Sequence, residues 1–194
     1  MSSEKFNKAI ELFDKANSED PTIELFEGKE FPKEILYAER MTRVLNRFAP
    51  EASEAVKLAA RCQHICRWKS PRRSYEMNRT GYLLWRQELK KMHASIASEI
   101  LLEVGYDNET IEKVAFLLQK KQLKRNEETQ LLEDVICLVF LEFYFDPFAG
   151  KYTEEKIIDI VQKTWRKMSD AGHEAALKIP FSKESLAIIT KALS

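Results

Sequence analysis

Residues 130–145 read QLLEDVICLVFLEFYF, the most apolar run in the chain. Its apolar residues leave no wide polar face, so the run predicts a helix that is buried on most of its sides. We expect this helix to extend from Glu127 to about Phe145, where Asp146-Pro147 ends it. We also expect it to be the central helix of the fold.

On both sides of this run, apolar residues recur at helical spacing, and no useful stretch alternates with the period of a strand. The sequence therefore predicts an all-α fold, a bundle of about seven or eight helices. We expect one domain that covers residues 1–194. The remaining helices are expected at 3–16, about 33–48, 51–68, 82–104, from 108 onward, 153–168 and from 182 onward.

Composition points to a protein of the cytoplasm. Thirty-one Lys and Arg balance 31 Asp and Glu, and the three Cys are an odd number, which is typical of reduced thiols. No apolar run reaches the roughly 18 residues of a membrane span, and the segment 1–5, MSSEK, lacks the apolar core of a secretory leader. We expect no membrane partner, and the oligomeric state is left open.

Residues 58–93 form a strongly basic stretch inside this neutral chain. The stretch contains nine Lys and Arg against two Glu, a net charge of +7. Ser70-Pro71 ends a helix in its middle, and we expect the segment up to Gly81 to be an ordered loop rich in Arg. Charge concentrated in this way predicts a local anion site.

Several basic and aromatic side chains are candidates to bind that anion. Arginine suits bidentate contacts with phosphate or carboxylate, and the interleaved aromatic rings suit stacking on a base. The alternative for the cations is an ordinary solvated face. The candidate ligand-binding residues are Arg61, Arg67, Trp68, Arg72, Arg73, Tyr82, Arg86, Lys120 and Arg166.

Asp134 lies on the apolar helix, where an ionised carboxylate is costly without a partner. Three explanations stay open: an ion pair with Arg61 or Arg86, a metal ligand beside His64 and His93, or a carboxylate that orients a histidine or binds a substrate amine. His64 and His93 are expected on facing helices. Each could equally be an ordinary hydrogen-bonded structural residue.

Several long motifs resemble an uncharacterised all-helical family. They are RCQHICRWKSPR, GYLLWRQELKKMH, LLEDVICLVFLEFYF, TWRKMSDAGHEAAL and the amino-terminal DPTIELFEGKEFPKEILYAERMT. That family is a domain of unknown function whose members are sometimes labelled glutamyl-tRNA synthetase-like. The resemblance covers nearly the whole chain and implies no established activity, and the chain has no nucleotide-binding signature of either synthetase class.

The chain is also distantly similar to the HD-domain metal-dependent phosphohydrolases, which are all-helical. This resemblance implies an HD-like fold in which His64, His93 and Asp134 are metal ligands and catalytic residues. The chain has no His-Asp dipeptide, the central pair of that family. Either the metal is held differently, or the fold is kept without the metal and arginines occupy its place.

These observations lead to one principal hypothesis and two alternatives. The principal one is a protein that binds a phosphorylated or nucleotide ligand in a basic pocket. If it is an enzyme, we expect phosphoester hydrolysis with a divalent metal ion. The alternatives are a non-catalytic RNA- or tRNA-binding module and a helical adaptor whose acidic residues 1–30, of net charge −4, contact a partner.

Overall fold

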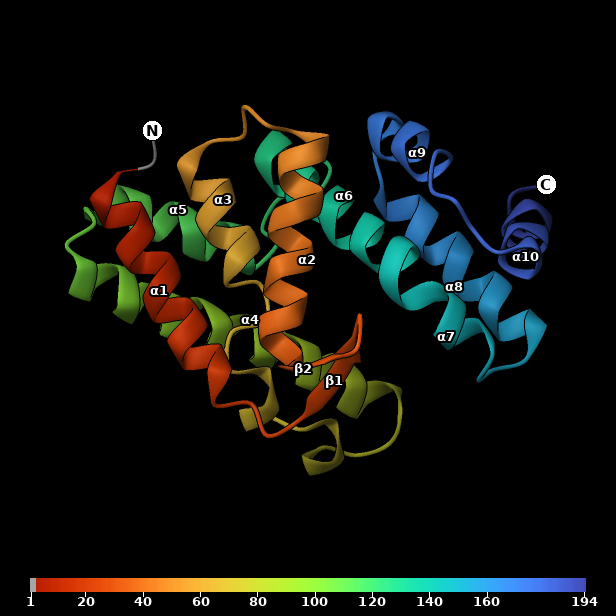
Figure 1. The fold of residues 1–194 in the computed structure, drawn as a ribbon, viewed down its shortest axis with the longest axis horizontal. Coiled ribbons are helices and arrows are strands. Elements are labelled where there is room, and N and C mark those ends of the chain that lie inside the picture. Colours follow the sequence, from red (N-terminus) through yellow and green to blue (C-terminus); the bar gives the residue numbers. More distant parts are fainter. Residues whose placement is uncertain (1–2) are drawn as a thin grey trace. The chain divides into compact units, whose positions relative to one another are not determined.

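Helices account for most of residues 3–194, the part of the chain that the computed structural model describes (Figure 1). The all-α prediction is confirmed, although these residues form ten α-helices instead of seven or eight, and a two-stranded hairpin. The chain divides into two compact units, Met1–Lys121 and Gln122–Ser194. That the whole chain is one domain stays a prediction.

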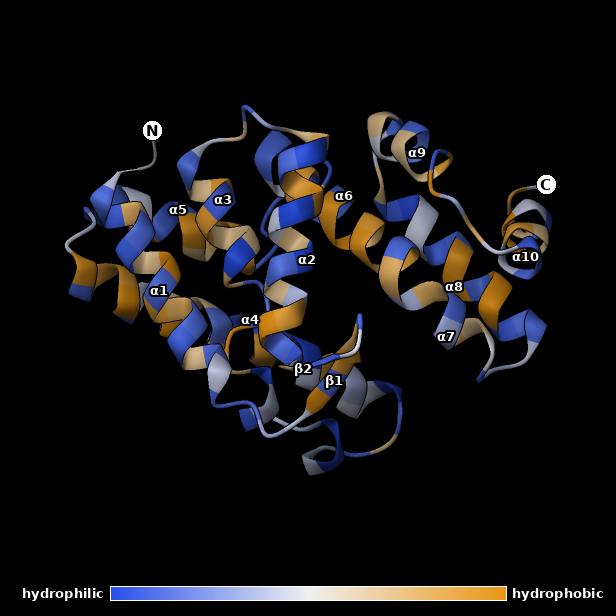
Figure 2. Cartoon of the chain, in the orientation of Figure 1, coloured by the Kyte–Doolittle hydropathy of each residue, from blue (hydrophilic) through white to orange (hydrophobic). Residues whose placement is uncertain are grey.

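The first unit is built from five helices and the hairpin. Within it α4 packs along α1 and α5, and α3 contacts α1, α2 and α5. Apolar residues form stripes along α1 and α2, with hydrophilic residues on the other sides (Figure 2). The elements are α1 (Glu4–Ser18), β1 (Ile23–Phe26), β2 (Lys29–Pro32), α2 (Lys33–Phe48), α3 (Glu54–Arg61), α4 (Arg79–Val104) and α5 (Asn108–Leu118).

The helix boundaries follow local capping chemistry. The side chains of Ser3, Ser53 and Asn78 accept hydrogen bonds from the first turns of α1, α3 and α4. Gly105 ends α4 in the left-handed conformation, with φ +87, and the helix therefore stops at Val104, where the sequence predicts its end. The cap of α5 is Asp107, one residue before the expected Asn108, because the Asp107 carboxylate accepts from the backbone of Thr110.

The hairpin is an element that the sequence did not predict. Its strands pair antiparallel, with Ile23 opposite Pro32 and Phe26 opposite Lys29. Glu27 and Gly28 form the turn with φ +50 and φ +76, and two positive values are typical of a tight hairpin turn. The strands are four residues long, and the first turn position is Glu where Asn, Asp or Gly is usual, so the pattern is weak.

The helix expected at 51–68 ends early, at Arg61. The chain then forms a series of turns, and Cys66 takes a left-handed conformation with φ +54. Two short 3₁₀ helices, Arg67–Lys69 and Arg72–Ser74, follow before α4 begins. The segment between the two helices is therefore ordered, but it is longer than the sequence predicts.

The second unit contains the apolar run. Its predicted helix is present as α6, but residues 140–144 form a π-helix that leads directly into α7. Within the unit α6 contacts α8 and α9, and α10 contacts α7 and α8. The helices are α6 (Glu127–Val139), α7 (Phe145–Ala149), α8 (Glu154–Lys167), α9 (Asp170–Ala176) and α10 (Lys183–Leu193).

Among residues 3–194 no helix is both long enough and apolar enough to cross a membrane. The amino-terminal segment 1–5, discussed above for its lack of an apolar core, is described only from residue 3 onward.

Gly81 allows α4 to begin against the loop before it. A Cβ atom at this buried position would lie 2.2 Å from the backbone oxygen of Glu76. Gly81→Ala should therefore lower the free energy of unfolding by about 1–3 kcal/mol, although alanine is the better helix former. Denaturant unfolding of the two proteins measures this difference.

Gly150→Ala is the matched control. Gly150 has a φ of −69, and its added Cβ would meet no atom within 4 Å. This variant should be as stable as the wild type or slightly more stable. Equal stability of the Gly81→Ala and Gly150→Ala proteins would contradict the close approach of α4 to Glu76.

Candidate functional site

The turn after α3 creates the candidate site. The side-chain oxygen of Asn17, at the end of α1, accepts the backbone N–H of Cys66 at 3.0 Å. This bond holds the left-handed turn, across which the side chains of His64 and Arg67 contact each other. The helix expected at 51–68 would place Arg61 and His64 on one helix face, but α3 ends at Arg61, so the two residues do not share a face.

His64 is held between a cation and an acid. The Arg67 Nη1 atom lies 2.8 Å from His64 Nε2, and the Glu34 Oε2 atom lies 3.4 Å from His64 Nδ1. The same Nη1 atom lies 3.2 Å from His64 Nδ1, so the guanidinium lies against both nitrogen atoms of the imidazole. The Tyr37 ring stacks on the imidazole at 4.0 Å between centroids, so the ring is fixed on all these sides.

His93, on α4, is the second histidine of the site. Its ring centroid lies 6.0 Å from that of His64, so the structure brings together the two histidines that the sequence singled out. His93 Nδ1 donates to the carbonyl oxygen of Ile65 at 2.7 Å. Burial lowers the pKa of His93 to about 4, and burial also holds the pKa of His64 well below its usual value. Both rings are therefore neutral near pH 7.

Glu34 is the site residue that sequence analysis missed. Its side chain is buried, and burial raises its pKa from 4.5 to about 7, although the nearby Arg67 lowers it. Its Oε2 atom accepts no hydrogen bond. A signal was present, since Glu34 begins the stripe of α2 that continues through Ala38, Met41 and Leu45 into the core.

Several positively charged side chains act on His64. After burial, the groups that lower its pKa most are Arg67, His93, Arg86 and Lys120, and each does so by disfavouring added positive charge. Arg86 also lowers the pKa of Arg67, because one positive charge disfavours the other. Three of the predicted ligand-binding residues, Arg67, Arg86 and Lys120, therefore all lower the pKa of His64.

This environment does not fit a divalent metal ion. The Arg67 Nη1 atom lies 2.8 Å from Nε2 and 3.2 Å from Nδ1 of His64, and Arg86 and Lys120 add further positive charge. Within residues 3–194 no three His, Cys, Asp or Glu side chains are grouped so that they could hold a metal. A metal held by His64, His93 and Asp134 stays a prediction from the sequence, and we derive no chemistry from it.

Two predicted ligand-binding arginines have structural partners. Arg61 makes a two-pronged contact with Asp14 of α1, at 2.7 and 2.6 Å, and a third bond to Thr42 of α2. Arg72 donates to the carbonyl oxygens of Tyr75, Glu76 and Asn78 and so ties the loop together. These bonds account for Arg61 and Arg72 without a ligand.

Other candidates lie at the surface. Arg73 is exposed, and Trp68 is half-buried with Lys69 5.9 Å from its ring centroid. Arg166 lies in the second unit, exposed on α8. Neither Arg73 nor Arg166 is among the charges that most affect His64.

Asp134 has a local role within the second unit. Its buried carboxylate accepts from the backbone and hydroxyl of Ser169, at 2.8 and 2.6 Å, and from Gln130 at 3.1 Å. Ser169 in turn caps α9. A Cβ on Gly172 would lie 2.7 Å from the Asp134 oxygen, so this glycine permits the close approach. Asp134 therefore fixes the turn between α8 and α9.

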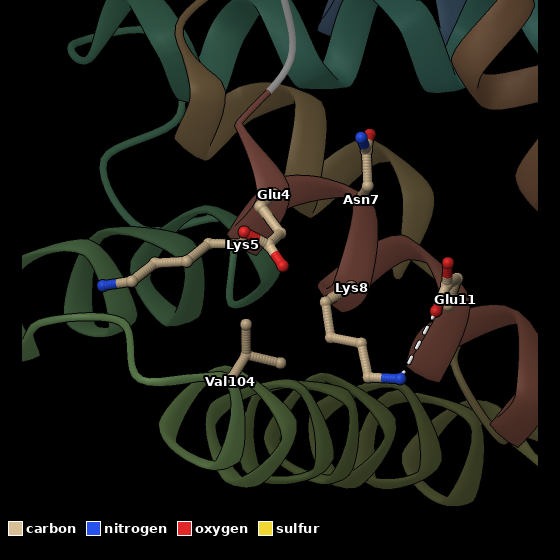
Figure 3. A pocket seen from close by; sticks show the side chains of 6 residues that line it. All are labelled: Glu4, Lys5, Asn7, Lys8, Glu11 and Val104. Carbon is tan, nitrogen blue, oxygen red and sulfur yellow. Dashed lines mark hydrogen bonds and ion pairs between the residues drawn. The ribbon is translucent and has the colours of Figure 1, made fainter.

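The first unit also has an open groove beside α1, with a volume of about 630 Å³ (Figure 3). It is lined by Glu4, Lys5, Asn7, Lys8, Glu11 and Val104, none of which the sequence singled out. Lys8 lies 3.4 Å from Glu11, and Lys5 donates to the carbonyl oxygen of Gly105. Because charges of both signs line it and pair locally, this groove does not select an anion.

The chain belongs to the family described as a domain of unknown function (DUF4202), whose model matches residues 7–189. The resemblance to an uncharacterised family is thereby confirmed. No curated protein and no solved structure matches the chain. The more distant similarity to HD-domain proteins stays a prediction.

The raised pKa of Glu34 makes stability depend on pH. In the unfolded chain the Glu34 carboxyl has its ordinary pKa of 4.5. Between pH 4.5 and 7 the folded chain therefore binds more protons than the unfolded chain, and the folded state loses stability as the pH rises. Glu34→Gln removes this loss. The stability of the variant relative to the wild type should therefore rise by about 3 kcal/mol from pH 4.5 to pH 8.

Urea unfolding of both proteins across this range measures the difference. The comparison is needed because His64 and His93, with lowered pKa values, change stability in the opposite direction below pH 6.5. Because both proteins contain the two histidines, the contributions of His64 and His93 cancel to first order in the difference between the two stabilities. Glu39→Gln, on an exposed position of the same helix, should show no such trend. A difference that is independent of pH would contradict a buried, proton-binding Glu34.

Proposed function

We propose that this member of the DUF4202 family binds a phosphorylated small molecule at Arg67 and Arg86, beside the His64–His93 pair. What supports this most is the largely buried Arg67 guanidinium 2.8 Å from His64, together with Arg86 and Lys120, whose positive charges also lower the pKa of His64. The two imidazoles are neutral, so they supply hydrogen-bonding nitrogen atoms without further charge.

The cost of burying Arg67 supports an anionic ligand. Burial lowers its pKa, which means that its charged form is poorly solvated in the site. Glu34 offsets part of this cost, but its own pKa of about 7 leaves it partly protonated near neutral pH. A phosphate group would supply the missing negative charge, and guanidinium groups suit its oxygen atoms.

Hydrolysis of the ligand, and binding of RNA or a protein partner, stay predictions from the sequence. Hydrolysis would need a side chain that transfers a proton. Glu34, with a pKa of about 7, is the residue of this site best suited to do so.

Arg86→Gln tests the proposed site because it removes one cation while keeping a polar side chain of similar length. Loss of a charge-assisted contact should weaken the binding of inorganic phosphate about tenfold. Isothermal titration calorimetry at fixed ionic strength measures the dissociation constant. Affinity should also fall as salt is added, because part of it is electrostatic.

Arg166→Gln is the control, since Arg166 is an exposed arginine on another helix. This variant should bind phosphate as the wild type does. If both variants lose affinity equally, or neither does, the phosphate is not bound at Arg86. A wild-type protein that shows no phosphate binding would overturn the proposed function itself.

A further inference from the structure

Tyr82 presents a half-exposed aromatic ring next to the proposed phosphate site. We propose that the ligand is a mononucleotide, whose phosphate meets Arg67 and Arg86 and whose base stacks on Tyr82. This inference rests on the proposed function and adds to it the chemical class of the ligand.

The Tyr82 ring is held in place from one side. It lies in the first turns of α4, and its centroid is 5.9 Å from that of Trp85 at an angle of 51°. The Arg72 guanidinium lies 6.0 Å from both ring centroids, and the loop carbonyl groups fix that guanidinium. The ring is thus positioned before any ligand arrives, which reduces the entropy cost of stacking.

The rest of the ring is accessible. Tyr82 is 46% exposed, whereas the neighbouring Trp85 is 9% exposed and donates its indole N–H to Ser70. Trp85 is therefore a structural support, and Tyr82 is the aromatic surface that a ligand can reach. Stacking on such a ring tolerates any base, because every base has a π-face.

Arg67 connects this ring to the phosphate site. Its guanidinium carbon lies 5.2 Å from the Trp85 ring centroid, while its Nη1 atom contacts His64. Tyr82 is also close enough to affect the ionisation of Arg67. A ligand that joins a planar ring to a phosphate would match both parts, whereas a sugar phosphate would use only one.

The test compares ligands that share the phosphate and differ in the base. The full chain is titrated calorimetrically with inorganic phosphate, ribose 5-phosphate and the four ribonucleoside monophosphates. At least one nucleotide should bind the wild type about tenfold more tightly than ribose 5-phosphate. In Tyr82→Leu this advantage should disappear, while the affinity for inorganic phosphate stays unchanged.

Two further variants separate stacking from other effects. Tyr82→Phe keeps the ring and should keep the advantage of the nucleotide. Tyr152→Leu is the matched control, because Tyr152 is also 46% exposed but lies in the second unit. It should bind every ligand as the wild type does.

The outcomes distinguish this inference from the proposed function. If phosphate binds but every nucleotide equals ribose 5-phosphate, the base does not stack and the inference is overturned, while the phosphate site stands. If none of the ligands binds, the proposed function fails. Tight binding of a single-stranded RNA 12-mer, with no binding of mononucleotides, would also overturn the inference and favour an RNA-binding surface.

Discussion

One hydrogen bond between segments far apart in the sequence determines the geometry of the candidate site. Asn17 is buried at the end of α1, and its side chain accepts the backbone N–H of Cys66. A left-handed Cys66 costs about 1–2 kcal/mol, so the turn needs such a contact to persist. The same turn directs the Ile65 carbonyl to His93 and brings Arg67 to His64, so both imidazoles are oriented by it.

The protonation states follow from that orientation. Arg67 contacts both nitrogen atoms of the His64 ring, and the Glu34 carboxylate lies 3.4 Å from one of them, Nδ1. Burial raises the pKa of Glu34 and lowers those of both histidines, which moves every one of these groups toward its neutral form. The arginines stay charged, so the site as a whole favours an anion.

Periodicity predicted most helices of the fold because their apolar faces are local properties of the sequence. The apolar run at 130–145 is helical and α10 begins after Ser182, as predicted, but Asp146-Pro147 does not end the helical run, because α7 continues through these residues. The helix across residues 62–68 was wrong for a nonlocal reason, since its pattern is helical and the contact with Asn17 is more than 40 residues away. The hairpin was missed because four-residue strands carry little pattern.

The candidate site was predicted in part. The basic stretch and the pairing of His64 with His93 were visible in the sequence, but the acid of the site, Glu34, was overlooked in favour of Asp134. A carboxylate on an apolar helix is expected to be buried, but its position in the sequence does not identify its hydrogen-bond partner. Ser169 donates a hydrogen bond to Asp134, whereas one oxygen of Glu34 has no hydrogen-bond donor. Partners of this kind are set by tertiary packing.

The arginines of the basic stretch have different roles, and an excess of positive charge in the sequence therefore does not by itself identify a ligand-binding site. Arg61 is neutralised by Asp14, and Arg72 is bound by backbone carbonyl groups, so both contribute to structure. Arg67 is different because it is largely buried, its side chain contacts a neutral imidazole, and Glu34, with a pKa of about 7, offsets its charge only in part. Because a buried cation is poorly solvated, an anion that binds beside it replaces the missing water, and this makes binding more favourable. By this criterion the function of the basic stretch resides in Arg67 and its neighbours, and the rest of the stretch holds them in place.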